Sequence, residues 1–527
     1  MGRGLALSVV ACAALSGVAI VSPLRGAGLG LLAAGGAAGL VVGLWLAGPG
    51  RRRPKVHPLE LMAVAGVLAF LLPLLTMAVA PGADMAMHAA LARALLEASD
   101  ALSAAWGSVN VALYPRGLAA LIALAAPALG IAKASLLASG LAHVVVLLGL
   151  AAFLTTVVRS RWPFALATVA VLASKSPQSF FDWGGNPTAM AFGLALFAVA
   201  QLGASWSGSG GSLAVRSAAG ASFFLLGAAA THPAGALAGA LSVAGLPMLG
   251  RPTRKGMAAA AVALLAFGAG LLALSVGGPQ VSAAEAAWIA DYQRNVEAVL
   301  RGPAALFPVE VWRGMAQRLG VAWTVTVAAA ALVVAAARLW RPIAGMALAV
   351  VAVGAVLAIG PLLPGVGLLF YPARFAPLLL VATVPLVGSA FERLDGRLPV
   401  LARGAFLVLA VTAAVMSVRT YQRAIPMATA NDLAAIECVR TRVPPSDVVE
   451  GAYGDASQWI PALAGIAVTA AHPHITLNDE IRTQPARRST YRFVGERLRY
   501  GTPLDRPSPT GPPLCAFGKA ALFRLTD

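Results

Sequence analysis

The sequence predicts an all-α polytopic membrane protein with a small α/β domain at its carboxyl end. Of the 527 residues, 59% are hydrophobic and only 11% are charged, whereas soluble domains carry roughly 25% charged residues. Apolar runs as long as a membrane span recur along residues 1–417. The remaining region, 418–527, contains no such run and is richer in Pro, Arg, Asp and Thr. We therefore expect a transmembrane domain, 1–417, followed by a soluble domain, 418–527.

A membrane-spanning helix needs roughly 20 consecutive apolar residues. Clear runs of that kind lie at 4–22, 27–48, 59–80, 134–158, 187–204, 257–276, 320–338, 343–364, 375–390 and 399–417. Shorter runs at 162–175 and on both sides of Thr231-His232-Pro233 bring the expected total to about 13 spans. The run 117–131 decides the topology, because a full span there would reverse the sides of the loops that follow. We favour a re-entrant or shallow helix, which keeps the basic segment 159–161 in the cytoplasm.

Basic residues between the apolar runs predict which loops face the cytoplasm. The net charge of +18 would suggest nucleic acid in a soluble chain, but here the excess lies in short clusters, as the positive-inside rule expects. The clusters lie at 51–55, 251–255, 338–341 and 393–397. With these inside, the amino terminus is cytoplasmic, and loops 81–116 and 277–318 and the domain 418–527 are extracytoplasmic. We expect a multi-pass plasma-membrane protein with no nucleic-acid partner, whose first apolar run is an uncleaved span.

The first external loop carries the strongest candidate for chemistry, Asp84. Only five carboxylates occur in the first 284 residues, and Asp84 stands just past a long apolar run. An ionisable group costs about 2.5 to 3.5 kcal/mol at the bilayer centre, so those kept beside a span are functional candidates. Asp84 also occupies the expected N-cap position of a helix over 85–97. A capping role and a catalytic role both remain open.

His88 lies one turn beyond Asp84 on the same predicted helix, so the two side chains can share a proton or a cation. The spacing of Met87, Leu91 and Leu95 predicts an amphipathic helix that lies in the membrane interface.

Tyr-Pro segments open two later helices at the outer boundary. Tyr114 and Arg116 precede the helix 117–131, and Tyr371 and Arg374 precede the twelfth predicted span. Tyr is common in the aromatic belt, and Arg can extend its charge to lipid head groups. An arginine at a helix start also favours a bound anion, because the helix dipole is positive there. A lipid phosphate would fit, and Arg374 is the better candidate to bind it.

Two other external segments combine polar groups with breaks in apolar runs. His232 interrupts a hydrophobic stretch within Thr231-His232-Pro233, either as a polar group that closes the helix break or as a ligand of phosphate or a leaving group. The segment Asp182-Trp183-Gly-Gly-Asn186-Pro187 is either a tight turn or a sugar site. Sugars are held by such mixtures, with aromatic faces on C–H surfaces and carboxylates or amides on hydroxyls.

The cysteines and histidines argue for a disulfide and against a zinc site. Cys12 lies in the first span, whereas Cys438 and Cys515 both lie in the predicted extracytoplasmic domain. An even pair outside the cytoplasm predicts a Cys438–Cys515 disulfide, with two separate buried thiols as the alternative. The six histidines and three cysteines show no zinc-ligand spacing, and no Walker loop or dinucleotide fingerprint occurs.

Taken together, these motifs resemble the GT-C superfamily of membrane glycosyltransferases, and more closely a group of uncharacterised actinobacterial GT-C-like membrane proteins. The segments that carry the resemblance are Tyr114–Gly117, Gly184–Pro187, Thr231–Pro233, Tyr371–Arg374 and Ser457–Gly465. The resemblance covers most of the chain, although each motif is short. It implies a GT-C-like fold and transfer of a sugar from a polyprenyl-phosphate carrier to a glycan or lipid acceptor of the cell envelope.

In that family, the acid of the first loop acts as a general base, so the resemblance implies this role for Asp84. Arg374 and His232 would then neutralise the departing phosphate. The superfamily often has paired acids in this loop, whereas here Met85 follows Asp84, so a divalent cation is left open and no other cofactor is expected.

A lipid or glycan transporter or flippase is the main alternative, because it shares the hydropathy and the broken helices. Coupled transporters usually need ionisable groups within their spans, and none of the 21 acids falls in the middle of a predicted span. This favours external chemistry over ion coupling. A non-catalytic membrane scaffold, for which Asp84 would be dispensable, is the third alternative.

Overall fold

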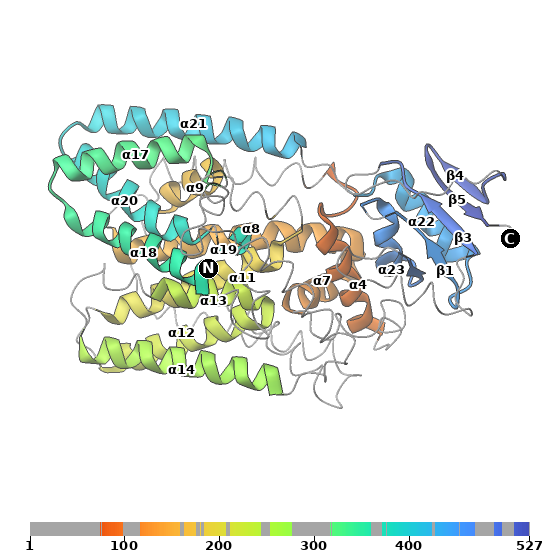
Figure 1. The fold of residues 1–527 in the computed structure, drawn as a ribbon, viewed down its shortest axis with the longest axis horizontal. Helices are drawn as coiled ribbons and strands as arrows, with labels where there is room; N and C mark the ends of the chain where they lie inside the picture. Colours follow the sequence, from red (N-terminus) through yellow and green to blue (C-terminus); the bar gives the residue numbers. More distant parts are fainter. Residues whose placement is uncertain are drawn as a thin grey trace.

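The computed structural model describes residues 74, 76–97, 116–158, 163–174, 180, 184–206, 211–243, 253–276, 313, 317, 319–359, 372–375, 377–423, 427–452, 454–469, 490–497 and 511–525. The predicted spans 4–22 and 27–48, most of 59–80 and nearly all of the loop 277–318 lie outside these residues. The described part consists of a helical bundle and a small domain with a β-sheet at its carboxyl end, at the right of Figure 1.

Most predicted apolar runs form helices within a few residues of their expected bounds. The bundle contains α7 (Gly117–Leu129), α8 (Ile131–Val157), α9 (Pro163–Ala173), α11 (Asn186–Trp206), α12 (Gly211–Thr231), α13 (Pro233–Ser242), α14 (Arg254–Val276), α17 (Val321–Ala336), α18 (Trp340–Ile359), α19 (Pro372–Phe375), α20 (Leu378–Asp395) and α21 (Pro399–Arg423). The helix α21 continues past residue 417, and the division of the chain into two domains there stays a prediction.

Apolar helices of spanning length mark this chain as a membrane protein. Four described helices contain stretches long and apolar enough to cross a bilayer: Ile131–Thr156, Asn186–Gly203, Ala214–Thr231 and Pro399–Met416. The helix α7 has 13 residues, so it extends about 20 Å, short of the roughly 30 Å hydrocarbon core. The expected total of about 13 spans stays a prediction.

Glycines allow α8, α11 and α13 to pack with their backbones in close contact at the centre of the bundle (Figure 1). A Cβ atom on Gly149 of α8 would overlap the carbonyl oxygen of Gly193 on α11. On the other side of α11, a Cβ on Gly235 of α13 would lie 2.6 Å from the Thr188 oxygen, and one on Gly239 would overlap Ala195. Small residues at such crossings are how membrane helices gain van der Waals contact.

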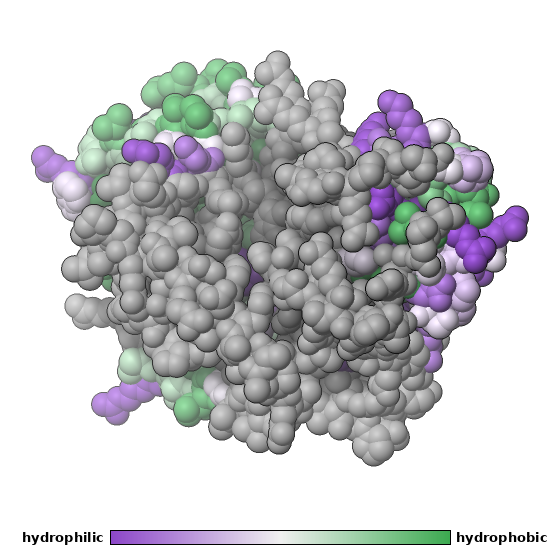
Figure 2. All heavy atoms as spheres, turned by 45° about the vertical axis from the view of Figure 1, so that its right-hand side comes forward, coloured by the Kyte–Doolittle hydropathy of each residue, from purple (hydrophilic) through white to green (hydrophobic). Residues whose placement is uncertain are grey.

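The outer helices expose aliphatic side chains. On α17, Val325 is 62% exposed, and on α21, Val400 is 85% exposed. Figure 2 shows hydrophobic side chains gathered at its upper left, on the side of the bundle where α17 and α21 lie. Such a surface is unfavourable in water and suits contact with lipid tails.

The small domain contains a five-stranded sheet with the strand order β2-β1-β3-β5-β4. Its strands are β1 (Val448–Glu450), β2 (Ala467–Val468), β3 (Tyr491–Val494), β4 (Cys515–Phe517) and β5 (Ala520–Arg524). The strand β1 pairs in parallel with β2 and β3, whereas β5 pairs antiparallel with β3 and β4. The helix α22 (Ala430–Arg442), the 3₁₀ helix η6 (Ala456–Trp459) and α23 (Ile460–Leu463) complete the domain. The predicted α/β character is thus observed: the sequence predicts strands at 448–450, 467–469 and 520–523, which match β1, β2 and β5, whereas β3 and β4 were not predicted.

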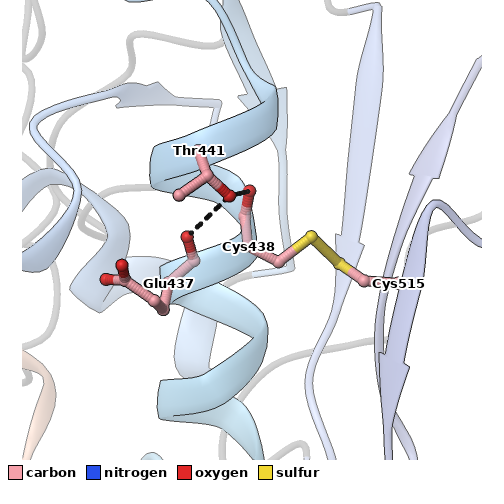
Figure 3. The surroundings of a disulfide bond; sticks show 4 residues. All are labelled: Glu437, Cys438, Thr441 and Cys515. Carbon is pink, nitrogen blue, oxygen red and sulfur yellow. Dashed lines mark hydrogen bonds between the residues drawn. A yellow bond between two sulfur atoms is a disulfide. The ribbon is translucent and has the colours of Figure 1, made fainter.

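A disulfide joins Cys438 on α22 to Cys515 on β4 (Figure 3). These are the two cysteines that the sequence analysis pairs. They are 77 residues apart, so the bond closes a long loop and restricts the unfolded chain. It fixes α22 against the edge of the sheet.

Polar contacts hold the amino-terminal end of α22 to the segment that follows β3. Thr429 and Asp432 form a capping box, and the Asp432 carboxylate also accepts a 2.8 Å hydrogen bond from the Glu496 backbone N–H. The Thr429 hydroxyl and the Asn431 amide both donate to Glu496, each at 2.6 Å. These bonds give the segment after β3 a fixed place beside α22.

Two carboxylates are buried within the small domain. Glu450 on β1 forms a 2.8 Å ion pair with Arg492 on the neighbouring strand β3, which offsets the cost of burying both charges. Asp455 accepts hydrogen bonds from the Ser457 and Gly495 backbone N–H groups. Burial, with a smaller contribution from the charge of Asp432, raises the pKa of Asp455 from 3.8 to about 6, although those hydrogen bonds oppose the shift.

We predict that Gly239→Leu destabilises the bundle, because even the first carbon of the new side chain overlaps Ala195. Overpacking of this kind costs about 1 to 3 kcal/mol, and thermal unfolding of the protein in detergent measures it. Gly268→Ala on α14 is the matched control, since an added Cβ there meets nothing within 4 Å. Equal melting temperatures for Gly239→Leu and wild type would contradict the packing described.

Asp455 should make the stability of the small domain depend on pH. Because its folded pKa lies above the ordinary value, its contribution is fully present below about pH 4 and is lost as pH rises through about 6. The loss amounts to about 3 kcal/mol. We expect Asp455→Asn to remove this part of the pH dependence between pH 4 and 7, as measured by denaturant unfolding at each pH. Parallel pH profiles of the free energy of unfolding for wild type and Asp455→Asn would contradict this prediction.

Candidate functional site

The helix α4 (Ala83–Glu97) carries both Asp84 and His88. The chain turns into it at Gly82, whose φ is +91°, and the Met85 N–H bonds to the Gly82 carbonyl. Asp84 therefore lies within the first helical turn, and the expectation that it is the N-cap is wrong. The turn at Pro81-Gly82 lets the helix begin at Ala83, whereas the sequence predicted a start after Asp84. A carboxylate in the first turn is still favoured by the helix dipole.

The prediction that this helix lies in the membrane interface is also wrong. All side chains from Met85 to Ala92 are buried, including His88, which is only 1% exposed. The helix packs against α7 and α8 of the bundle on one side and against η6 and α23 of the small domain on the other. Its apolar stripe therefore meets protein on several sides instead of lipid.

The glycine-rich turn before α11 approaches the start of α4. Gly184 has a φ of +89°, and a Cβ there would lie 3.0 Å from the Asp84 nitrogen and 3.1 Å from the Asp84 Cβ. Only glycine fits a backbone with this φ and this contact without strain. The turn leads into Asn186, a fully buried side chain whose amide donates a 3.1 Å hydrogen bond to the Ser139 hydroxyl of α8. Two predicted site residues, Asp84 and Asn186, are thus brought to the same end of the bundle.

His232 lies at the break between α12 and α13. Pro233 lacks a backbone N–H, so α12 cannot continue through it, and His232 has an extended backbone. Its Nδ1 accepts a 3.2 Å hydrogen bond from the Ala234 N–H. The side chain is only 7% exposed. The histidine therefore closes the helix break as one interpretation expected, and its Nε2 is left for other contacts.

Arg374 approaches His232 from another part of the chain. It belongs to the short helix α19, which packs against α13, and its side chain is partly buried. Arg374 and His88 lie near enough to the His232 ring to interact with it electrostatically. Basic side chains from α4, from the α12–α13 break and from α19 are therefore neighbours in space although they are far apart in sequence.

Arg116 immediately precedes α7, the helix that packs beside α4. Its side chain is partly buried. It adds a positive charge at a helix start next to α4, where the helix dipole is also positive. Among the residues that the structure describes, this end of the bundle therefore combines the Asp84 carboxylate with the guanidinium groups of Arg116 and Arg374.

Four predicted site residues, Tyr114, Asp182, Trp183 and Tyr371, lie outside the described residues. Within the described part of the chain, no three His, Cys, Asp or Glu side chains gather in a way that could hold a metal ion. Asp84 and His88 alone are a small ligand set for a divalent cation.

The structure adds two residues that sequence reasoning did not select, Arg93 and Ser139. Arg93 on α4 donates a hydrogen bond to the Ala462 carbonyl of the small domain. Ser139 lies in the middle of an apolar helix and holds the Asn186 amide. The signal for Arg93 was its place on the Asp84 helix, whereas a lone serine in an apolar run carries no signal of its own.

These features define the chain as a polytopic membrane protein with a GT-C-like fold, which known structures support. The crystal structure of ArnT from Cupriavidus metallidurans in the apo state matches with a TM-score of 0.50 at 13% identity, covering 81% of this chain and 88% of ArnT. ArnT bound to undecaprenyl phosphate matches with a TM-score of 0.51 at 14% identity and the same coverage. The predicted GT-C-like architecture is therefore confirmed.

A third structure, the cryo-EM structure of the arabinofuranosyltransferase AftD from mycobacteria, matches with a TM-score of 0.47 at 16% identity. It covers 77% of this chain but 30% of AftD, and this likeness is too low to support an argument. No model of a known protein family and no curated protein sequence matches the chain. At these identities the comparisons establish the fold alone, and the relation to actinobacterial proteins stays a prediction.

Proposed function

We propose that this protein is a membrane glycosyltransferase that moves a sugar from a polyprenyl-phosphate carrier to a glycan or lipid acceptor of the cell envelope. The observation that carries the proposal is the position of His232 at the start of α13 and of Arg374 on α19, which packs against α13, together with His88 on the helix of Asp84. A phosphate head group needs cations, and an attacking hydroxyl needs a base. Both kinds of group are present at this end of the bundle, in a fold shared with a protein that binds undecaprenyl phosphate.

Arg374 and His232 explain how a lipid phosphate would be bound and released. A guanidinium such as Arg374 can donate two hydrogen bonds to phosphate oxygens. The imidazole Nε2 of His232 can donate another, because its Nδ1 already accepts from the Ala234 N–H. As the bond between sugar and phosphate breaks, negative charge grows on the phosphate, and fixed donors stabilise that charge.

Asp84 is the proposed general base. Its carboxylate takes the proton of an acceptor hydroxyl while the hydroxyl oxygen attacks the anomeric carbon of the sugar. The bond between that carbon and the phosphate oxygen breaks, and its electron pair leaves with the phosphate. The contact between Gly184 and Asp84 keeps the carboxylate close to the motif 182–187, for which a sugar site is one of the two interpretations.

The arrangement of charges supports an extracytoplasmic site. The basic turns between α17 and α18 and between α20 and α21 lie at the left of Figure 1, at the end of the bundle opposite the small domain. Positive turns are typical of the cytoplasmic side. The end that carries α4, α7 and the small domain would then be extracytoplasmic, where a carrier lipid and an envelope acceptor meet.

The distribution of acids distinguishes this proposal from ion-coupled transport. In the described helices from α8 to α21, the only acids are Glu392 and Asp395, and both lie in the last turn of α20. Asp395 pairs there with Arg403. Carboxylates that carry protons or cations across a membrane lie within the spans. The described helices from α8 to α21 have no acid in their middle turns, which favours chemistry at one end of the bundle over ion-coupled transport.

We predict that Asp84→Asn lowers sugar transfer by about 100-fold or more, because a general base typically contributes that much. Membrane abundance and melting temperature should stay near wild type. Transfer is measured with purified protein and monosaccharide-linked undecaprenyl phosphates. Asp395→Asn, at the other end of the bundle, is the control and should leave transfer unchanged. Full transfer by Asp84→Asn would refute the assignment of the base.

For the phosphate site, Arg374→Ala should weaken binding of undecaprenyl phosphate by about 10-fold or more, since a charge-assisted hydrogen bond contributes about 1.5 to 3 kcal/mol. Binding is measured on protein in lipid nanodiscs. Arg397→Ala removes an exposed arginine from the opposite end of the bundle and should bind normally. Equal affinity of Arg374→Ala and wild type would exclude Arg374 from the site.

A further inference from the structure

The small domain contacts the helix that carries Asp84. The segment Ser457–Gly465, which forms η6 and α23, packs along α4. This segment is one of the motifs that carry the resemblance to the GT-C superfamily, and it has no role in the proposed chemistry. Two residues of this segment, Ala462 and Gly465, contact Arg93, which lies beyond His88 on α4.

Arg93 is the polar link between the two parts. Its Nη1 donates a 3.4 Å hydrogen bond to the Ala462 carbonyl of α23. Its Nε lies 2.7 Å from the Glu97 carboxylate one turn further along α4. The side chain is only 22% exposed. The guanidinium is thus held by its own helix on one side and by the small domain on the other.

Gly465 provides the space for that guanidinium. Its φ is +75°, and an added Cβ would lie 3.0 Å from Arg93 Cζ and 3.0 Å from Arg93 Nη2. A side chain here would therefore meet the planar group of Arg93 as well as an unfavourable backbone conformation. The contact therefore depends on the planar guanidinium of Arg93 and on a glycine at position 465.

We propose that Arg93 is a positioning residue through which the small domain sets the orientation of α4, and with it the place of Asp84 and His88; this inference rests on the proposed function. A helix with regular hydrogen bonds moves as a unit, so a rotation or shift at Arg93 reaches Asp84. The amino-terminal end of α4 contacts Gly184, and Arg93, nearer its other end, contacts Ala462 and Gly465. Reacting groups need placement to within about 1 Å.

The first test measures α4 directly and needs no substrate. Hydrogen–deuterium exchange of the full-length protein in nanodiscs should show faster exchange of the α4 amides in Arg93→Ala than in wild type, with α8 unchanged. Arg93→Lys should behave like Arg93→Ala, because an ammonium does not reproduce the fork. Arg440→Ala is the matched control, since Arg440 pairs with Glu437 on the exposed face of α22. Unchanged α4 exchange in Arg93→Ala would overturn the proposal.

The second test separates positioning from lipid binding. Arg93→Ala should lower kcat for transfer from monosaccharide-linked undecaprenyl phosphate by about 10-fold or more, while its affinity for undecaprenyl phosphate stays within about 2-fold of wild type. Unchanged kcat, or loss of lipid affinity equal to the loss of kcat, would overturn the positioning role. A wild-type protein that neither binds nor transfers would refute the proposed function, and the exchange measurement would still report on Arg93.

A double-mutant cycle tests the contact itself. Gly465→Ala should lower kcat in the presence of Arg93 and should have a smaller effect in the Arg93→Ala background, because the side chain that it displaces is gone. Gly130→Ala is the control for backbone strain, since Gly130 has the same φ of +75° and an added Cβ there meets nothing within 4 Å. Additive effects of the two substitutions would overturn the proposed coupling.

Discussion

The contact of α8, α11 and α13 through glycine and alanine is the constraint on which the rest of the structure depends. A Cβ at Gly149, Gly193, Gly235 or Gly239 would meet a neighbouring helix at less than ordinary contact distance. This packing fixes the height of α11 and α13 relative to each other. As a result, the turn at Gly184 and the break at His232, which precede these two helices, end up at the same end of the bundle.

Burial in an apolar bundle limits which polar groups can persist. Side chains such as Ser139, Asn186 and His232 are buried, and each has a hydrogen bond that reduces the cost of burial. The charged groups Asp84, Arg116 and Arg374 instead lie near helix starts, and each is only partly buried. Asp84 thus lies in the first turn of α4 and Arg116 immediately before α7, where the helix dipoles also favour anions.

The sequence was sufficient to predict the helices from α8 to α21, because long apolar runs and basic turns are strong local signals. Because polar groups are scarce in this sequence, it also indicates Asp84, His232 and Arg374 as candidate site residues, and their roles stay predictions. It did not predict the environment of α4, because Met87, Leu91 and Leu95 form the same pattern whether they face lipid or protein. The strands β3 and β4 were missed, since they are short and their pairing partner β5 lies far from β3 in sequence.

The position of α4 explains why a helix with two ionisable residues in its first turns is stable in the interior. Each of its sides is covered by a different part of the chain: α7 and α8 belong to the bundle, and η6 and α23 belong to the small domain. Met85 and Met87 on this helix are completely buried. The helix is therefore a joint element of the two parts. A small domain with its own sheet and disulfide thus contributes to the same end of the molecule as the helix breaks of the bundle.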